Sequence, residues 1–442
     1  MSKKSMILNL FFFNPQGDYR FSWRHPKSPT AEIFNLSYYK KLVQEAEASK
    51  FDAVFIADHV AVWDSVASGL RHYANPRLEP ITLLSALAAV TDHIGLMATA
   101  STSYNEPYNT ARFFASLDHL SEGRASWNIV TSWQEEEASN FGLAGVPKHG
   151  NRYERADEFI RVVKKLWDSW EDDSLEFNKH NGDFADPLKI HAVHHKGEYF
   201  NVRGPLNVPR PPQGHPILAQ AGSSEAGKNL AAAHADVHFC FLNAVEEGLA
   251  YRADLNRRLA LQGREPSDLK IIAGVLPVVL YEETEAETRQ RLVDSLIIDA
   301  VAIDLVSSYT RLDLTRLSPD EPLPLLPEED QFDGIRTHLA HIKQYDPDMS
   351  IREIGRLLLK SSSTWLVIGS PEHVAEKLSE LYAANAVDGY NLMFPFLPVD
   401  FERFSRSVVP LLQSKGVFRK EYESGTLRDR LGLKSPSNSF VP

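Results

Sequence analysis

The feature that most constrains the fold of this 442-residue chain is the repeated alternation of short apolar runs with longer amphipathic segments. The apolar runs have the length of strands, and most lack the strict polar–apolar alternation of a strand with one face in water. Runs of this kind are typical of parallel strands that are buried on both faces. We expect eight such strands, at residues 6–13, 51–57, 94–100, 124–130, 217–221, 237–242, 271–280 and 389–394.

Segments with helical spacing of apolar residues follow most of these strands. The clearest is 152–170, in which Phe159, Val162, Val163 and Trp167 share one face. Strand–helix units repeated about eight times favour a closed (β/α)8 TIM barrel over an open sheet. No Gly-x-Gly-x-x-Gly follows the first strand, which argues against a dinucleotide-binding domain. The other helices are expected at residues 37–49, 80–91, 111–120, 245–262, 283–298, 371–384 and 401–415.

We interpret residues 1–442 as one barrel domain with two insertions and a tail. The first insertion, at about 171–215, is polar and contains several prolines, and the second covers about 300–360. Within the second, the acidic, proline-rich stretch 313–331 predicts a lid loop over the active site. Residues 364–368 are strand-like but have no clear place in the repeat, and 420–442 read as a polar tail.

Composition excludes some classes of function. A net charge of −12 without a dense Lys/Arg block argues against a nucleic-acid partner. The apolar stretch near the N-terminus is too short to cross a membrane, so we expect a cytoplasmic protein without a membrane partner. The single cysteine, Cys240, lies in an apolar run and is expected to be buried. His191, His194 and His195 cluster in the polar insertion without cysteine, and a solvated loop explains them better than a metal site.

The stretch 217–236 combines a strand, a turn of small residues and an alanine-rich helix. This arrangement directs backbone N–H groups at an anion, and Ser223 or Ser224 can cap the helix. Gly222 and Lys228 give a partial Walker A spacing, but Asn229 stands where that motif needs a hydroxyl for magnesium. The turn therefore predicts a phosphate seat for a cofactor, with an ordinary ligand-free turn as the alternative.

In a barrel of this kind the active site is lined by side chains just beyond the strand ends. Those positions are rich in aromatic residues and short of titratable groups. Neither a close carboxylate pair nor a Gly-x-Ser-x-Gly elbow is present. We therefore expect the chemistry to come from a cofactor held in a dry pocket. The predicted lining consists of Asn14, Asp58, His59, 99–104, 128–133, 221–224 and 394–396.

A series of short motifs spans nearly the whole chain in a fixed order. Two of them are Trp-Asn-Ile-Val-Thr-Ser at 127–132 and Ala-Gly-Ser-Ser-Glu-Ala-Gly at 221–227. Through them the chain resembles the bacterial-luciferase-like flavin monooxygenases, in the branch of nitrilotriacetate, dibenzothiophene-sulfone and long-chain alkane monooxygenases. The remaining motifs lie at 23–26, 57–58, 99–104, 107–108, 115–121, 140–142, 149–153, 388–392 and 409–412.

The resemblance implies a barrel that binds reduced FMN (FMNH2), supplied by a separate NAD(P)H:flavin reductase. It also implies that O2 and a small-molecule substrate react there, and that the protein forms a homodimer or homotetramer. Two alternatives stay open: a deazaflavin (F420)-dependent hydride-transfer oxidoreductase of the same fold, and a non-catalytic flavin-binding protein. The insertion 171–215 and the motif at 127–132 favour the monooxygenase.

By the same resemblance, two groups of residues bind the cofactor. His149 and Tyr153 lie four positions apart, on one face of a helix start, and both can donate hydrogen bonds to a phosphate. Each candidate also has an ordinary explanation: a helix cap or ion pair for Asp58, strand-end packing for Thr99, a solvated helix start for the His–Tyr pair. The predicted flavin contacts are Asp58, Thr99 and Asn128, and the predicted phosphate contacts are His149, Tyr153, Ala221, Gly222, Ser223 and Ser224.

The substrate pocket is expected near Asn14, His59, Tyr104 and Trp133. In the alkane branch the position of Pro15 carries a cysteine and that of Trp133 a histidine. This departure argues against an alkane substrate and predicts that Trp133 narrows the pocket, while Asn14 orients a polar group. We expect a sulfur- or nitrogen-containing or xenobiotic compound as the substrate.

Overall fold

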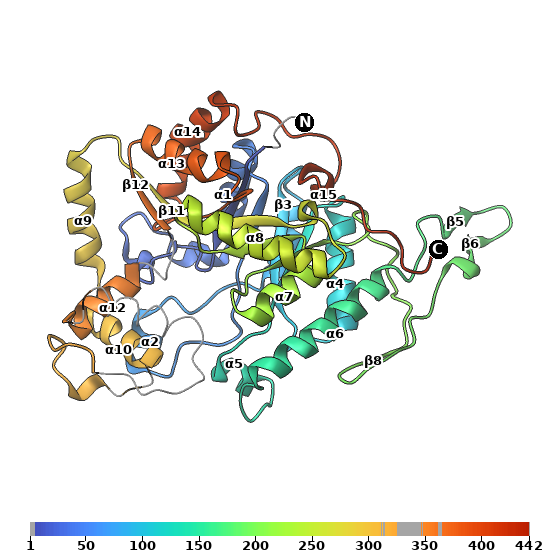
Figure 1. The fold of residues 1–442 in the computed structure, drawn as a ribbon, viewed down its shortest axis with the longest axis horizontal. Helices are drawn as coiled ribbons and strands as arrows, with labels where there is room; N and C mark the ends of the chain where they lie inside the picture. Colours follow the sequence, from blue (N-terminus) through green and yellow to red (C-terminus); the bar gives the residue numbers. More distant parts are fainter. Residues whose placement is uncertain are drawn as a thin grey trace.

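The computed structural model describes residues 5–310, 312, 314–324, 346, 348–360 and 365–441. Eight parallel strands close into a ring, because β1 pairs with both β2 and β13, and β10 pairs with both β9 and β11. The predicted (β/α)8 barrel is confirmed (Figure 1). The ring strands are β1 (Ile7–Phe12), β2 (Ala53–Ile56), β3 (Gly95–Ser101), β4 (Ala125–Val130), β9 (Ile217–Gln220), β10 (Val237–Cys240), β11 (Lys270–Val279) and β13 (Gly389–Met393).

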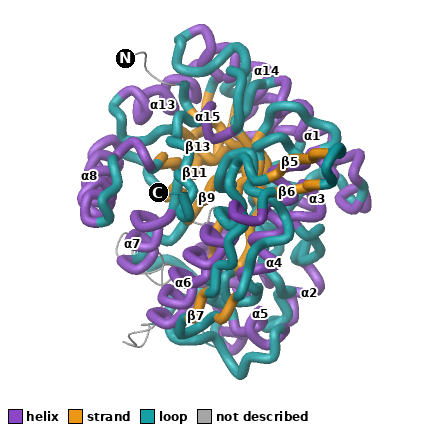
Figure 2. The backbone as a smooth tube through the Cα atoms, turned by 90° about the vertical axis from the view of Figure 1, so that its right-hand side faces the viewer, coloured by secondary structure: helices purple, strands orange, loops and turns teal. Residues whose placement is uncertain are grey.

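Helices surround these strands, and Figure 2 shows the strands gathered at the centre with helices around them. Apolar side chains between the two layers form one core, and a second core fills the inside of the barrel. The larger helices are α1 (Leu36–Ala48), α3 (Pro80–Ala88), α4 (Pro107–Leu120), α6 (His149–Trp167), α7 (Glu225–His234), α8 (Val245–Leu261), α9 (Thr284–Leu296), α13 (Pro371–Ala383) and α14 (Val399–Ser414). Each helix predicted from spacing is present, with shifts of a few residues at the ends.

The strand-like stretch near 364–368 forms a further strand, β12 (Trp365–Gly369), outside the ring. It pairs with the second half of β11, at Val275–Val279, whereas the first half of β11 pairs with β13. The ten-residue length of β11 makes both pairings possible. The ring therefore keeps eight strands although the sheet has nine.

The polar stretch after α6 leaves the barrel as two small hairpins. The first is made of β5 (Leu175–Asn178) and β6 (Asp183–Ala185), and it projects from the body of the molecule (Figure 1). The second is made of β7 (His195–Lys196) and β8 (Asn201–Val202). His191 and His195 each hydrogen-bond a carboxylate, at 2.7 Å and 2.9 Å. In the part of the chain that the structure describes, no three His, Cys, Asp or Glu side chains gather to hold a metal ion.

The second insertion contributes two helices that sequence spacing did not reveal, α10 (Asp299–Thr310) and α12 (Ile351–Lys360). Buried apolar residues of both belong to the inner core, which continues beneath them. Of the predicted lid loop at 313–331, residues 314–324 are described and begin with the short 3-10 helix Leu314–Arg316, whereas 313 and 325–331 lie outside the described residues. The other elements not expected are the short helices α2 (Ala67–His72), α5 (Glu135–Asn140) and α15 (Leu427–Arg430).

The C-terminal segment, expected as a polar tail, packs under the barrel. Leu427, Leu431 and Leu433 are buried in the inner core. Arg428 is only 3% exposed and donates to both carboxylate oxygens of Asp236. The segment is polar on average, so its sequence does not show that three leucines and one arginine are buried.

Cys240 is buried, as expected, and burial raises the pKa of its thiol. Within the described ranges, every helix is too short or too polar to span a lipid bilayer.

Candidate cofactor and substrate site

A relay of two hydrogen bonds joins three neighbouring strands at the carboxyl end of the barrel. Thr99 and Asn128 lie side by side in the pairing of β3 with β4. The hydroxyl of Thr99 donates to the carbonyl of Ile56 at 2.9 Å, and Asn128 Nδ2 donates to Thr99 Oγ1 at 2.9 Å. Because the Thr99 proton is committed to Ile56, the Asn128 amide must present its N–H to Thr99.

The other end of the Asn128 amide, Oδ1, is buried and accepts no hydrogen bond from any described residue. A buried amide oxygen without a donor is unusual in a folded protein. This oxygen is therefore able to accept a hydrogen bond from an N–H group of a ligand. Gln220 Oε1, at the end of β9, is buried and unpaired in the same way among the described residues.

The turn between β9 and α7 is the one for which the sequence predicts an anion seat. Ser224 is the N-cap of α7, and its hydroxyl oxygen accepts from the Gly227 N–H at 3.2 Å. The hydroxyl proton of Ser224 therefore points away from the helix and can be donated to a ligand. A Cβ on Gly222 would lie 2.9 Å from the Tyr153 hydroxyl and 2.4 Å from Gln220 Nε2. Only glycine keeps this space open.

The structure brings the upstream pair of phosphate candidates to this turn. His149 is the first residue of α6, and Tyr153 lies one turn later. Their ring centroids are 4.7 Å apart, and the Tyr153 hydroxyl reaches Gly222 as described above. Two segments far apart in sequence thus meet where the Tyr153 hydroxyl lies beside the Gly222 turn, with the His149 ring next to Tyr153, and hydroxyl and backbone N–H groups at such a place suit a phosphate group.

Asp58 and His59 follow β2 and face the same mouth. Burial raises the pKa of Asp58, whereas the backbone N–H of His59 and the charge of Arg77 act in the opposite direction. Burial, and then the charge of Arg77, lower the pKa of His59 to about 4. His59 is therefore neutral at physiological pH, and its Nε2 is hydrogen-bonded to the side-chain oxygen of Gln134.

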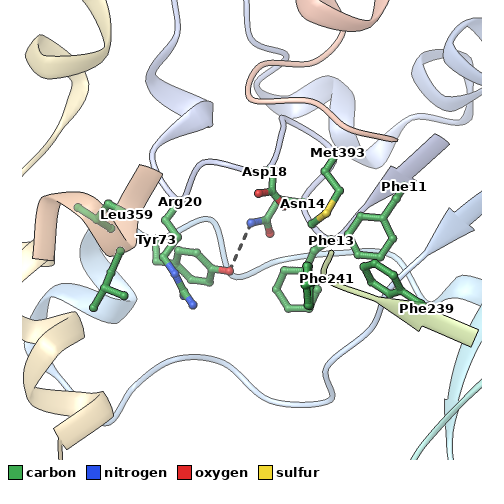
Figure 3. Close-up of a pocket in the computed structure, with 11 residues that line it drawn as sticks. Phe11, Phe13, Asn14, Asp18, Arg20, Tyr73, Phe239, Phe241, Leu359 and Met393 are labelled. Atoms are coloured by element: carbon green, nitrogen blue, oxygen red, sulfur yellow. Dashed lines mark hydrogen bonds between the residues drawn. The ribbon is translucent and has the colours of Figure 1, made fainter. Parts of the chain in front are cut away.

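A cavity of about 220 Å³ opens beside these strand ends, and its two walls differ in chemistry (Figure 3). One wall is aromatic and the other polar, with Asn14 Nδ2 donating to the Tyr73 hydroxyl at 3.3 Å. Burial raises the pKa of Asp18 in the polar wall to about 6, against the effect of Arg20. The lining residues are Phe11, Phe13, Phe239, Phe241, Met393, Leu358 and Leu359, together with Asn14, Asp18, Arg20 and Tyr73.

Of the four predicted substrate residues, only Asn14 lines this cavity. Tyr104 stacks on Phe141 with ring centroids 4.7 Å apart. Trp133 is 58% exposed, so it does not narrow the cavity. The chain turns outward just before it, at Ser132, whose φ of +48° lies in the left-handed region.

Sequence reasoning missed Asp18, Arg20 and Tyr73. Asp18 and Arg20 lie in the loop that leaves β1, so the rule that strand ends line the site would have found them if extended by a few residues. Tyr73 follows the short helix α2 and gave no periodic signal.

An eight-stranded barrel with an anion seat and an aromatic cavity at the carboxyl ends of its strands has the architecture of a cofactor-dependent barrel enzyme. The chain belongs to the luciferase-like monooxygenase family, whose family model matches residues 18–389. It is a monooxygenase, like the named relatives with which it aligns along its whole length.

Two curated relatives cover 100% of this chain and 99% of their own length. The N-acetyl-S-(2-succino)cysteine monooxygenase of Bacillus subtilis is 43% identical, and the nitrilotriacetate monooxygenase component A of Aminobacter aminovorans is 42% identical. Among solved structures, a riboflavin lyase crystallised with modified FMN and riboflavin is 31% identical. It has a TM-score of 0.84 over 98% of this chain and 97% of that one. The family works with reduced flavin.

Proposed function

We propose that this protein is an FMNH2-dependent monooxygenase of the two-component type, acting on a small organic compound that contains sulfur or nitrogen. The observation that carries the proposal is the open seat formed by Gly222, Ser224 and Tyr153, together with the unpaired Oδ1 of Asn128. The seat suits a phosphate and the amide oxygen suits an N–H of a flavin ring. These are the two ends of FMN.

The residues at the seat would hold the phosphate, with Tyr153, His149 and the hydroxyl of Ser224 as donors, and Ala221 and Ser223 completing the turn. Thr99, Asn128 and Asp58 would contact the ring. Reduced FMN supplies the chemistry, in which one oxygen atom of O2 enters the substrate and the other leaves as water.

The chain's own part is to orient and to exclude water. The aromatic wall keeps the cavity dry, and a dry site strengthens every polar contact within it. His59 is neutral and hydrogen-bonded to Gln134, so its ring is held in one orientation and adds no charge to the mouth of the barrel.

The names of the two relatives above support the substrate class. Nitrilotriacetate contains nitrogen, and N-acetyl-S-(2-succino)cysteine contains sulfur and nitrogen, and both are small acidic compounds. The name "component A" supports a separate partner, for which an NAD(P)H:flavin reductase is the chemistry required. We also expect a homodimer or homotetramer.

The test of the cofactor is binding. FMN and the deazaflavin cofactor are titrated separately into the protein, and FMN is expected to bind the more tightly. Gly222→Ala is expected to weaken FMN binding about tenfold, because the added methyl group meets Tyr153 and an overpacked site costs about 1–3 kcal/mol. Gly145→Ala is the matched control, since a Cβ there meets nothing within 4 Å. Tighter deazaflavin binding would sink the proposal.

The test of the reaction is substrate-dependent oxygen uptake with FMN and a generic flavin reductase. Acidic sulfur and nitrogen compounds are screened, and mass spectrometry of products formed under ¹⁸O2 is expected to show one labelled atom. Flavin binding without any labelled product from the panel would favour the non-catalytic alternative.

A further inference from the structure

The side chain of Gln220, the last residue of β9, reaches the turn that follows its own strand. Resting on the function proposed above, we propose that Gln220 is a further phosphate-binding residue. Its amide N–H group donates to the phosphate and makes the seat prefer a phosphorylated flavin over an unphosphorylated one.

The position of this amide follows from the path of the chain. Residues two positions apart in a strand point to the same face, and Gly222 comes two positions after Gln220. A Cβ at Gly222 would lie 2.4 Å from Nε2 of Gln220 and 2.9 Å from the hydroxyl of Tyr153. The amide nitrogen and the hydroxyl therefore border the same small space, which is open because position 222 has no side chain.

The amide of Gln220 has no hydrogen-bond partner among the described residues. Only 5% of the residue is exposed, and Oε1 is buried without a donor. Nε2 likewise donates to no described residue, although it lies beside Gly222. Such an amide is costly, because it has given up water without gaining a partner in the protein. An acceptor atom in the seat recovers part of that cost at Nε2.

Two hydroxyl groups beside Gln220 are also free to donate. Ser224 accepts from the Gly227 N–H, which leaves its own proton available, and the Tyr153 hydroxyl makes no hydrogen bond with a described residue. Within the described ranges, no carboxylate hydrogen-bonds or pairs with any of these three side chains. Three neutral donors at the N-terminus of α7 suit a phosphate dianion. A ligand without phosphate leaves the buried amide unpaired, so this arrangement discriminates between the two flavins.

The experiment compares FMN with riboflavin, which has the same ring and polyol chain but no phosphate. Each is titrated into the flavin-free protein, and binding is followed by the quenching of flavin fluorescence. Gln220→Leu is expected to weaken FMN binding about tenfold, because a hydrogen bond to a charged group is lost. Gln220→Glu, of the same size, is expected to weaken it about a hundredfold, because a carboxylate then faces the phosphate. Neither variant should change the affinity for riboflavin, and unchanged riboflavin binding shows that both are folded.

Gln262→Glu, at an exposed position just after α8, is the matched control and should leave both affinities unchanged. Equal loss of FMN and riboflavin binding would overturn the proposal, because Gln220 would then support the fold rather than the phosphate. FMN binding that is unchanged in both Gln220 variants, or tighter in Gln220→Leu, would also overturn it. Failure of the proposed function looks different, since the wild-type protein itself would then bind the deazaflavin more tightly than FMN.

Discussion

Asp18 carries a carboxyl group in the wall of an aromatic cavity, and this position has a measurable effect on stability. Burial raises its pKa to about 6, although Arg20 acts in the opposite direction. The folded protein therefore holds the Asp18 proton more tightly than the unfolded chain does. Asp18 lowers the free energy of unfolding as the pH rises from about 4 to about 6, and the loss persists above that range.

Replacement of Asp18 by Asn keeps the shape and removes this penalty. Asp18→Asn is expected to raise the free energy of unfolding by about 2 kcal/mol at pH 7.5 and to have little effect at pH 4, as measured by urea unfolding. Asp64→Asn, at an exposed position, is the control. An equal gain at both pH values would mean that the effect does not come from ionisation.

At the scale of single residues, the positions of the cofactor candidates in the barrel could be predicted from the sequence, whereas the lining of the cavity could not. Thr99, Asn128 and Gly222 stand at or near strand ends, which parallel pairing brings together. Arg20 and Tyr73 depend on the paths of two loops, and loop paths leave no periodic signal. Trp133 follows a residue with positive φ, which its sequence neighbours did not reveal.

The element that anchors the first insertion is α6, through carboxylates paired with histidines. Glu158, on α6, pairs with His195 at 2.9 Å, and Asp168, just after α6, pairs with His215 at 2.8 Å. Burial lowers the pKa of His215, although Asp168 acts to raise it. Burial alone would raise the pKa of Asp168, but His215, Ser439 and Arg210 outweigh it and lower that pKa.

Both shifts make the protein less stable in acid. The folded state disfavours a proton on His215, so stability falls as the pH drops below about 6.5, and Asp168 adds to the loss at lower pH. His215→Gln keeps a donor for Asp168 but does not titrate. This variant is expected to lose less stability than the wild type between pH 7 and 5, at a cost of about 1 kcal/mol at pH 7. Parallel curves from urea unfolding across that range would contradict this expectation.

Strands and helices with a strong periodic pattern of apolar residues were predictable. Those that depend on pairing or packing with another element were not. The ring strands are continuous apolar runs, because both faces are covered. The role of β12 depends on the extra length of β11, and α10 and α12 bury their apolar faces against each other and the inner core. No local pattern marks such partners in advance.

For the molecule as a whole, the C-terminal segment closes the floor of the barrel. Arg428 and Asp236 form a buried ion pair at 2.8 Å, and loss of one partner leaves a buried charge alone. Arg428→Met is expected to lower the free energy of unfolding by about 3–5 kcal/mol in urea titrations. Adding Asp236→Asn should recover part of that loss, whereas strictly additive effects would show that the two residues do not interact.

The barrel itself was predictable from the count of buried strands. The segment that covers the end of the barrel where the strands begin was not predictable. Residues 420–442 are polar on average, and Arg428 looks like a surface residue in the sequence. Its burial depends on Asp236, which lies far upstream. A charge pair between distant segments has no signature in either segment alone.

The pairing of β1 with β13, which closes the ring, also sets the point in synthesis at which the barrel can finish folding. Asn9 on β1 hydrogen-bonds Asn391 on β13, and 382 positions separate them. At a synthesis rate of about 5–20 residues per second, β1 leaves the ribosome roughly 20–80 s before its partner exists. For that time the nascent chain carries an unpaired strand edge, which is the kind of surface that aggregates or recruits chaperones. A nascent chain stalled before β13 therefore has no route to a closed barrel, however well its earlier strands have paired.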